Sequence, residues 1–392
     1  MDADVGEAPE VEDKRKREIM IDKWVAIVKG MGAASEIYNG AADMTELRAS
    51  VSDVLAKKAE ATMRARESAI SAFLRWCRTQ GEDPWPPHER LGYRYAQHLR
   101  DAGAAPTKAN SFVKALSFAG YLFGVKGYKE VVKSTRVTGA AWAMFLNKGR
   151  RKERSPFTVF QVKAMQATVS AKGDLLTRLL AGLGCCLISC RLRFADAQRA
   201  VDEPTLDLAQ DRSGYLELRL GDTKTTNTPQ GVRAEKVAIG HALGLDGTTW
   251  AEDWLEVRRT VGLNVAKDGC LMPAPDGHGK FLARRMRSHE FMKWLRCFVN
   301  ELATKPSANQ LIGSHSSKVT LLSWAGKYGL GKGDRRTLGC HVKKDERQVN
   351  LYSRDAQAAP MRRLAVVEQA IRDDVFFPDE TRSGYFKGKS AK

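Results

Sequence analysis

The segment from Leu175 to Asp196 reads LLTRLLAGLGCCLISCRLRFAD and decides how the second half of the chain folds. From Leu175 to Arg191 its apolar residues occupy nearly every face of a helix instead of one stripe, which is typical of a helix buried on all sides. The longest apolar run, Leu179 to Cys190, is too short to span a lipid bilayer. The segment therefore predicts a buried helix in a globular domain, and we expect no membrane partner.

Helices and one hairpin are expected around this segment. Thr158 is suited to cap a helix that runs to Ala171. Residues 215–220 alternate apolar and polar side chains, as a half-buried strand does, and a returning strand is expected over residues 232–239 after the turn signal Gly221-Asp222. Further helices are expected at residues 250–261, 289–302, 315–328 and 364–373. This half therefore reads as mostly helical with a small antiparallel sheet.

The first half is predicted to be wholly helical between residues 45 and 147. Apolar residues recur there at helical spacing, as in Ala69, Ile70, Phe73, Leu74 and Cys77. Strand-like alternation is absent, and Gly and Pro residues separate four helical stretches. The whole chain is thus predicted to be mainly α, with a compact helical domain over residues 45–147 and a larger, mostly helical domain over residues 157–377.

Three segments outside these domains are distinguished by composition. Residues 1–44 are expected to form a charged, partly disordered arm, in which the run Lys14-Arg15-Lys16-Arg17 is either a nuclear import signal or the solvated start of a helix. Residues 148–156 read as a basic linker that ends at Pro156, and such a linker is suited to lie across a phosphate backbone. Residues 378–392 are expected to be a flexible tail.

The charge of the chain indicates a polyanionic partner. Its 392 residues include 64 Lys and Arg against 46 Asp and Glu, a formal net charge of +18. The excess is uneven, with +5 on residues 1–150 and +13 on residues 151–392. Such a surplus most simply fits nucleic acid, although many basic proteins carry one for solubility alone.

Cysteine usage and the N-terminus bear on the compartment. The seven cysteines are scattered without a C-x-x-C pair, so a structural zinc site is not expected and a reducing compartment is. The N-terminus opens on an acidic run and lacks the pattern of a signal peptide. We expect the nucleus as the location in a eukaryotic host, and otherwise the cytoplasm or nucleoid.

An ordered series of cations that ends in a tyrosine is the chemically informative feature of the second half. Motifs of nucleotide-binding loops, zinc proteases and serine hydrolases are absent. The series consists of Arg193 with Asp196, then Lys224 at the tip of the expected hairpin, His315 with Lys318, His341, and Tyr352.

This series, preceded by a helical domain and a basic linker, resembles the tyrosine recombinase (phage-integrase-like) family over residues 45–375. The tetrad Tyr352-Ser353-Arg354-Asp355 looks most like recombinases of eukaryotic mobile elements. The resemblance implies a helical core-binding (SAM-like) domain that binds double-stranded DNA, a catalytic recombinase domain, and a homo-oligomer, usually a tetramer on two duplexes. It implies DNA recombination or integration without a cofactor.

The resemblance also implies roles for single residues. Arg193 matches the first catalytic arginine and Asp196 its acidic neighbour. Lys224 matches the general acid for the leaving 5′ oxygen, and His315 and Lys318 match the His-x-x-Arg box. His341 matches the second histidine position and Tyr352 the nucleophile that forms a covalent 3′-phosphotyrosine link. The residues expected to contact DNA are Arg150, Arg151, Lys152, Arg154 and Arg191.

Physical chemistry supports this distribution of roles. Cutting a phosphodiester requires cations that neutralise the charge developing on the non-bridging oxygens, and the planar fork of arginine does this best. A tyrosine that attacks phosphorus retains the bond energy in a covalent link, and a lysine or histidine then protonates the departing oxygen. Arg191 competes with Arg193 for the first role. Arg193 is preferred because Asp196 then falls in register.

Two departures from the family pattern leave the function open. Lys318 stands where the family has its second arginine and lacks the bidentate grip, and Cys340 separates Leu338-Gly339 from His341. Either change weakens catalysis and leaves DNA binding untouched. The alternatives are therefore a catalytically weakened DNA-binding protein derived from a mobile-element recombinase, and an unrelated basic helical scaffold that binds RNA.

Overall fold

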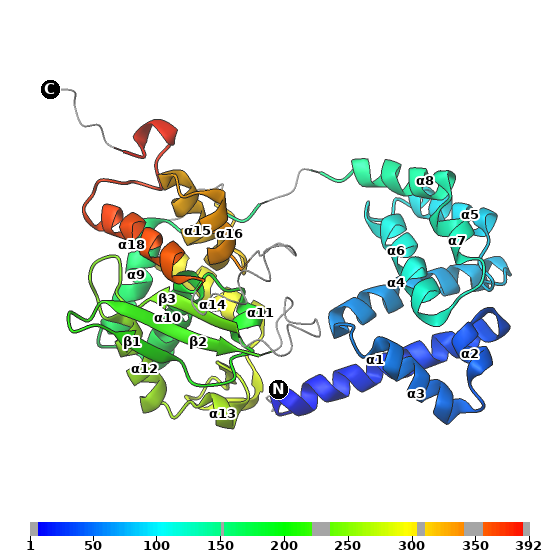
Figure 1. The fold of residues 1–392 in the computed structure, drawn as a ribbon, viewed down its shortest axis with the longest axis horizontal. Coiled ribbons are helices and arrows are strands. Elements are labelled where there is room, and N and C mark those ends of the chain that lie inside the picture. Colours follow the sequence, from blue (N-terminus) through cyan, green and yellow to red (C-terminus); the bar gives the residue numbers. More distant parts are fainter. Residues whose placement is uncertain (1–6, 150–152, 222–235, 304–309, 341–355, 387–392) are drawn as a thin grey trace. The chain divides into compact units, whose positions relative to one another are not determined.

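The computed structural model describes residues 7–149, 153–221, 236–303, 310–340 and 356–386. The chain divides into two compact units (Figure 1). Unit 2 comprises residues 11–151, and unit 1 comprises residues 152–392 together with residues 1–10. Each unit has a hydrophobic core of its own.

Unit 2 is built from helices alone among its described residues. In chain order they are α1 (Pro9–Met31), η1 (Gly32–Ala34), α2 (Glu36–Gly40), α3 (Met44–Leu55), α4 (Glu60–Gln80), α5 (Glu89–Asp101), α6 (Lys108–Phe123), α7 (Tyr128–Val132) and α8 (Thr135–Leu146). Helices α4 and α6 pack on each other, and α8 packs on α5 and α6. The last of the four helical stretches predicted for residues 45–147 is split into α7 and α8. Ser134 accepts a hydrogen bond from the Val137 N–H and so caps α8 as a new helix.

Aromatic side chains fill the core of unit 2. The ring of Phe73 lies 4.8 Å from that of Phe112 and 5.2 Å from that of Tyr95, and the ring of Trp24 lies 5.2 Å from that of Phe123. These five side chains are all buried. Burial of such large apolar surfaces is the main stabilising term of a helical unit of this size.

The predicted arm over residues 1–44 is corrected by this core. Helix α1 contributes the fully buried Trp24, so most of the segment belongs to the folded unit. The run Lys14–Arg17 lies inside α1, in agreement with the prediction that it is the solvated start of a helix. The Arg17 guanidinium donates to the carbonyls of Leu55, Ala56 and Lys58, where α3 ends, and this favours the helical reading.

Unit 1 combines helices with two small antiparallel sheets. Its helices are α9 (Val159–Ser170), α10 (Leu175–Ser189), α11 (Phe194–Ala197), α12 (Trp250–Thr260), α13 (Val265–Asp268), α14 (Ser288–Glu301), α15 (Ser316–Tyr328), α16 (Lys332–Leu338), α18 (Ala358–Arg372) and η3 (Arg382–Gly384). Its strands are β1 (Thr205–Leu208), β2 (Gly214–Leu220), β3 (Lys236–His241), β4 (Pro273–Pro275) and β5 (Phe281–Arg285). The order β1-β2-β3 forms one sheet, and β4 pairs with β5.

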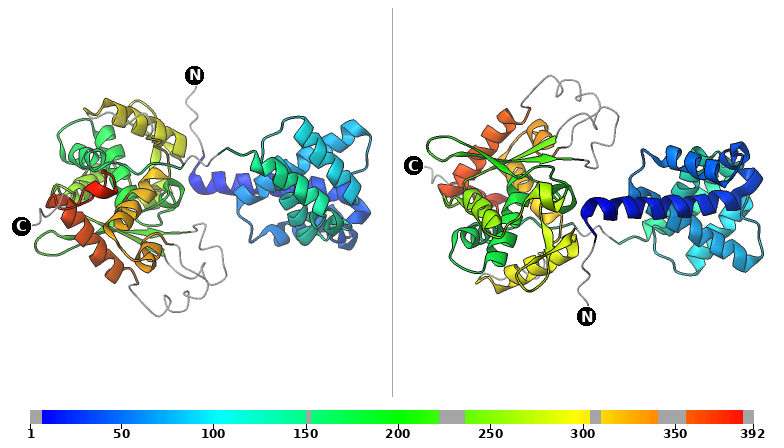
Figure 2. Two further views of the ribbon diagram at one scale, coloured as in Figure 1. Left: turned by 90° about the horizontal axis from the view of Figure 1, so that it is seen from above. Right: turned by 90° about the horizontal axis from the view of Figure 1, so that it is seen from below.

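Helix α10 is the buried centre of unit 1, as predicted. It contacts α9, α12, α14, α15 and β3, and from Leu179 to Ser189 every residue is buried. Gly182 lets the indole of Trp254 approach, because a Cβ at this position would stand 1.9 Å from the ring. Figure 2 shows the sheet and the surrounding helices of this unit from two further sides.

The predicted mainly α class with a small antiparallel sheet is confirmed. The predicted caps and hairpin are present as well: Thr158 forms a capping box with Gln161, and β2 pairs with β3 in antiparallel register. The structure adds β1, the β4–β5 pair and α16, which the sequence pattern did not indicate. Each of these elements has no more than seven residues, too few to establish a period.

Candidate functional site

Arg193 and Asp196 lie where the chain leaves the buried helix α10. Arg193 is the residue before α11, and Asp196 lies within that short helix. The Arg193 guanidinium contacts the Asp196 carboxylate at 3.4 Å, and 36% of the arginine side chain stays exposed while Asp196 is buried. The carboxylate therefore orients an arginine that still faces solvent in part.

His315 and Lys318 lie at the start of α15. His315 is the residue before the helix and is exposed, whereas Lys318 is buried at 4% exposure. The Lys318 ammonium donates to the carbonyl oxygen of Gly339 at 2.9 Å. One proton of this ammonium is thereby held by the backbone just after α16.

Arg191 occupies the interior of the same region. Its Nε donates to the Leu338 carbonyl at 3.0 Å, one terminal nitrogen donates to Ser189 at 2.5 Å, and the other donates to Ile239 at 2.8 Å. The residue is 2% exposed, and burial lowers the pKa of its guanidinium, which nevertheless stays charged. The predicted contact of Arg191 with a DNA phosphate is therefore corrected, because its guanidinium binds protein carbonyls out of reach of solvent.

These contacts bring together the segments that carry the sequence-predicted residues. Arg191 and Lys318 bind the carbonyls of two successive residues, Leu338 and Gly339. The exit of α10, the start of α15 and the end of α16 therefore meet at one place. The described chain stops at Cys340, one residue before His341.

Several predicted residues lie outside the described part of the chain. They are Arg150, Arg151, Lys152, Lys224, His341 and Tyr352. The ends of the strands on either side of residues 222–235 are described: the Gly221 N–H donates to the Arg199 carbonyl at 2.9 Å, and Leu220 forms a β-bridge with Ala200. The end of β2 therefore lies beside Arg199 and Ala200, which follow Asp196 by three and four residues.

Arg154 lies beside the segment that leads into α15. Its side chain covers Gly313, where a Cβ would stand 2.7 Å from the arginine Nε. The Ser155 N–H donates to the Leu311 carbonyl, and the Leu311 N–H donates back to the Ser155 hydroxyl, both at 3.1 Å. These paired bonds hold Arg154 beside residues 311–313, which lead directly to His315.

A groove next to Arg154 contains a second arginine that sequence reasoning missed. Its lining residues are Arg154, Arg296, Val299, Asn300, Gln310, Leu311 and Ile312. Arg296 belongs to α14, and exposed residues recur along this helix at His289, Lys293, Arg296 and Asn300. This spacing of four, three and four residues puts one basic and polar stripe on the solvent face. The stripe could have been found from the sequence once residues 289–302 were predicted to be helical.

Unit 2 has a basic side of its own. Residues 102–149, which form α6 to α8, contain seven basic side chains and one acidic one, whereas residues 1–101 contain sixteen basic and eighteen acidic ones. A groove on this side is lined by Asn110, Val113, Thr135, Thr138, Gly139, Ala141 and Trp142. Trp142 is 58% exposed, which is unusual for so large an apolar side chain.

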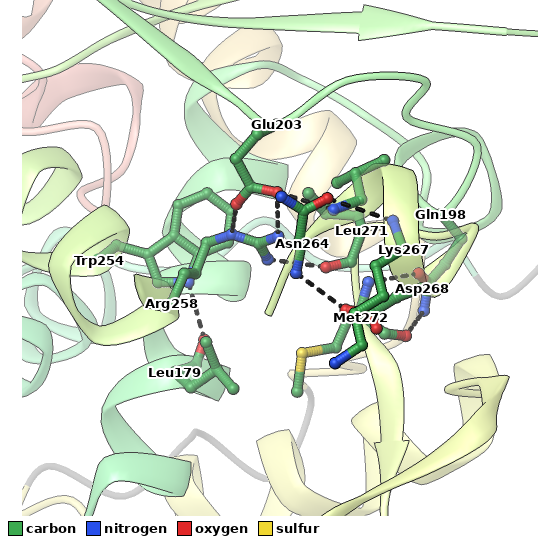
Figure 3. Close-up of polar contacts among 11 residues, drawn as sticks. Leu179, Gln198, Glu203, Trp254, Arg258, Asn264, Lys267, Asp268, Leu271 and Met272 are labelled. Carbon is green, nitrogen blue, oxygen red and sulfur yellow. Dashed lines mark hydrogen bonds and ion pairs between the residues drawn. The ribbon is translucent and has the colours of Figure 1, made fainter. Parts of the chain in front are cut away.

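A second buried arginine in unit 1 has a different environment (Figure 3). Arg258 is 1% exposed and binds both oxygens of the Glu203 carboxylate, at 2.5 and 3.0 Å. It also donates to the Leu271 carbonyl at 2.7 Å and lies 5.2 Å from the ring of Trp254. These contacts fasten α12 to the segments on both sides of it, so Arg258 has a structural role.

Within the described residues, no group of three or more His, Cys, Asp or Glu side chains is placed to hold a metal ion. Among the same residues, no helix is long and apolar enough to cross a membrane.

The molecule is thus defined as a mainly α protein in which α10, α15 and α16 of unit 1 meet at two buried cations. No protein-family model matches the sequence, and no curated protein matches it. Among solved structures, the chain is similar to the Tn1549 transposon integrase, residues 82–397, in complex with circular intermediate DNA, at a TM-score of 0.36 and 13% identity over 71% of this chain and 84% of that one. It is also similar to a variant of that integrase fragment in complex with transposon right end DNA, at a TM-score of 0.39 and 13% identity over 76% of this chain and 93% of that one.

Proposed function

We propose that the chain is a site-specific DNA recombinase or integrase that cuts and rejoins DNA through a covalent 3′-phosphotyrosine intermediate. The observation that carries this proposal is the meeting of three segments at Leu338 and Gly339, whose carbonyls bind Arg191 and Lys318. Arg193 follows Arg191 by two residues, and His341 follows Gly339 by two. The end of α10, the start of α15 and the end of α16, which are far apart in the sequence, therefore meet at one place in unit 1.

In the proposed reaction, the Tyr352 hydroxyl attacks the phosphorus of a DNA phosphodiester. The hydroxyl proton passes to solvent as an O–P bond to the tyrosine oxygen forms, the bond to the 5′ oxygen breaks, and Lys224 donates a proton to that leaving oxygen. Rejoining is the reverse step, in which a 5′ hydroxyl displaces the tyrosine. Because the phosphotyrosine link retains the energy of the broken bond, the cycle needs no cofactor.

Arg193 is proposed to hold the non-bridging oxygens of the phosphate. Its guanidinium is partly exposed, and Asp196 contacts only one of its nitrogens. The remaining N–H groups are suited to a bidentate grip on a phosphate. His315, which is exposed at the start of α15, is proposed to supply a further donor.

DNA outside the cleaved phosphate is proposed to be held by Arg154 and Arg296 in unit 1 and by the basic side of unit 2. The groove between Arg154 and Arg296 contains two guanidinium groups and two side-chain amides, and it contains no carboxylate. On unit 2, Asn110, Thr135 and Thr138 line a groove on the basic side and offer donors and acceptors for base edges. DNA is favoured over RNA here because no aromatic strand motif of the RNA-binding kind is present in the sequence.

The experiment that tests the proposed function is the trapping of a covalent adduct. Binding sites are first selected from a random duplex library, and a nick is then placed in the selected sites so that the cleaved end diffuses away. The wild-type chain is expected to form a denaturant-resistant adduct, and Tyr352→Phe none. Tyr385→Phe, whose ring packs on Phe376, serves as the matched control and should keep full activity. An adduct that persists in Tyr352→Phe would overturn the proposal.

A second candidate function is a DNA-binding protein that has lost most of its catalysis. The burial of Lys318 and its bond to the Gly339 carbonyl favour it, because a lysine held in this way contributes less to a phosphate than the arginine fork of the family. Under this reading Lys318→Arg should gain cleavage. If wild type binds its selected sites, forms no adduct, and Lys318→Arg forms one, the second candidate is correct.

Three further properties are proposed on the family resemblance alone. They are assembly as a tetramer on two duplexes, descent from recombinases of eukaryotic mobile elements, and a nuclear location in a eukaryotic host. Mass photometry of the chain on a selected duplex is expected to give four copies on two duplexes. A complex that stays at one copy for each duplex would contradict the first of them.

A further inference from the structure

We propose that Arg191 is a positioning residue of the proposed site, because its guanidinium ties the end of α10, which leads to Arg193, to strand β3 and to the end of α16. The inference rests on the proposed function for its chemistry. The three carbonyl contacts of the Arg191 guanidinium, called the tie below, can be tested without activity. Arg191 does not touch the substrate in this proposal. It acts through the described backbone of α10, β3 and α16, and so on Arg193 two residues along the chain.

Each of the three carbonyls that bind Arg191 belongs to a different segment. Ser189 is the last residue of α10, which leads to Arg193. Ile239 belongs to β3, the strand that follows the hairpin segment with Lys224. Leu338 is the last residue of α16, from which the chain continues to His341 and Tyr352.

The close packing of β3 on α10 fits this role. At Gly240, a Cβ would stand 2.8 Å from the backbone carbon of Ser189 and 2.9 Å from the Cys190 nitrogen. The strand therefore runs directly against the end of α10, and the Arg191 guanidinium lies where strand and helix meet. Lys318 adds a fourth segment, because its ammonium binds the Gly339 carbonyl next to Leu338.

The backbone conformation of Arg191 indicates that its side chain makes a favourable contribution at this position. Its φ is +52°, in the left-handed region that a residue with a side chain adopts at a cost of about 1 kcal/mol or more. Glycine would adopt the same φ without strain. An arginine at this position is strained locally, so its side chain must contribute something that glycine lacks, and the three carbonyl contacts are that contribution.

The charge of Arg191 also serves the site. Among the described residues no carboxylate forms an ion pair with it, and two of its three partners are carbonyls at the ends of α10 and α16, which carry partial negative charge. Burial lowers the pKa of the guanidinium, and the Glu368 carboxylate acts on it through space and raises that pKa, so carbonyl dipoles and a carboxylate share the compensation. The positive charge of Arg191, two residues from Arg193, lowers the cost of the charge that develops there during the reaction.

The variant Arg191→Gly tests the proposal, because glycine relieves the backbone strain and removes only the tie. Hydrogen exchange of the full chain is expected to quicken in three separate peptides, those that cover residues 187–193, 236–241 and 335–340. Arg178→Ala, which removes a single side-chain bond to the Val169 carbonyl at the other end of α10, is the matched control and should leave these peptides unchanged. Faster exchange in only one of the three peptides, or in none, would overturn the tie.

The catalytic consequence is measured on the nicked duplex. We expect Arg191→Gly to bind DNA as wild type does and to form the covalent adduct about 100-fold more slowly, since small displacements of catalytic groups have effects of this size. Guanidinium ion at a few tens of millimolar should restore much of the rate in Arg191→Gly and none in Arg178→Ala, with sodium chloride at the same concentration as control. A purely structural role predicts no such rescue.

The two failures are distinguishable. If wild type forms no adduct while the three peptides respond together in Arg191→Gly, the proposed function fails and the tie stands. If wild type forms the adduct and Arg191→Gly equals it, the positioning role fails and the proposed function stands.

Discussion

Two arginines of unit 1, Arg191 and Arg258, are almost completely buried, and they are compensated in different ways. Arg258 binds the Glu203 carboxylate through two nitrogens and lies against Trp254 (Figure 3). Arg191 is equally buried but binds three backbone carbonyls from three segments. Arg258 is in direct contact with a carboxylate, whereas Arg191 contacts carbonyl dipoles and is reached by the Glu368 carboxylate only through space.

The difference indicates what each region does. A neutralised pair such as Arg258 and Glu203 fastens elements together and adds little field around it. A cation held by carbonyls fastens elements and leaves more of its positive charge for an anion nearby. Arg258 therefore has a structural role at α12, and the proposal gives Arg191 a positioning role beside the proposed phosphate site.

The largest effect is expected for Arg258→Ala, which leaves the Glu203 carboxylate without its partner. The Glu203 side chain is 35% exposed and is solvated after the change, so the loss comes from the charge-assisted hydrogen bonds and the packing of the buried guanidinium, about 2–3 kcal/mol of the free energy of unfolding. Urea unfolding of the full chain, followed by tryptophan fluorescence, measures it. Arg259→Ala is the matched control: it removes the next residue in the chain, whose side chain is 73% exposed, and should cost less than about 0.5 kcal/mol. Equal losses in the two variants would contradict the structural role of Arg258.

Acid should reduce the stabilisation that an arginine gains from a carboxylate in direct contact, and it should affect the carbonyl contacts of Arg191 less. Burial alone would raise the pKa of Glu290, but hydrogen bonds from the Arg284 guanidinium and the Arg287 N–H bring that pKa below its ordinary value. A carboxyl whose pKa is lower in the folded state stabilises the protein above the pKa it has when unfolded, and the stabilisation is lost as the pH falls through the folded value.

We therefore expect wild type to be more stable than Glu290→Gln by about 1 kcal/mol at pH 6, as for other capping interactions, and the gap to close below about pH 4. Urea unfolding at a series of pH values measures it. Protection factors of residues 187–193, which are corrected for the pH dependence of intrinsic exchange, should change little over the same range, because no carboxyl contacts Arg191 directly among the described residues. A gap that is independent of pH would contradict the assignment of Glu290.

The smallest effect is expected for Arg296→Ala, which tests whether exposed cations of unit 1 bind phosphates. Each phosphate contact contributes about 0.9 to the slope of log affinity against log salt concentration. Arg296→Ala should therefore lower the slope by about 1 and the affinity several-fold, while Arg259→Ala changes neither. An unchanged slope in Arg296→Ala would remove the groove beside Arg154 from the DNA interface.

Elements with a clear apolar pattern were predicted from the sequence, and the prediction failed where overall composition was used in place of that pattern. Helix α10 was predicted because its apolar residues cover nearly every face of a helix, which is typical of a fully buried one. The arm prediction failed because the acidic and basic residues before position 19 hid the apolar series Met20, Ile21, Trp24 and Val28, which has helical spacing and forms part of the core of unit 2.

For the candidate site, the order of residues along the sequence indicated which ones to consider, but it did not predict whether each side chain is buried or exposed. The register that selected Arg193 over Arg191 is in keeping with the contact of Arg193 with Asp196. The burial of Arg191 could not be predicted, because arginine is normally an exposed residue and its three partners are backbone atoms that leave no mark on the sequence. The roles of Lys224, His341 and Tyr352 stay predictions.

The measurement that tests the account most directly is tandem mass spectrometry of the covalent DNA adduct after digestion with a protease and a nuclease. The account predicts one modified peptide, with a nucleotide joined through its 3′ phosphate to Tyr352. A nucleotide on any other residue, or no modified peptide from a duplex that the chain binds and that carries a nick at the selected site, would contradict it.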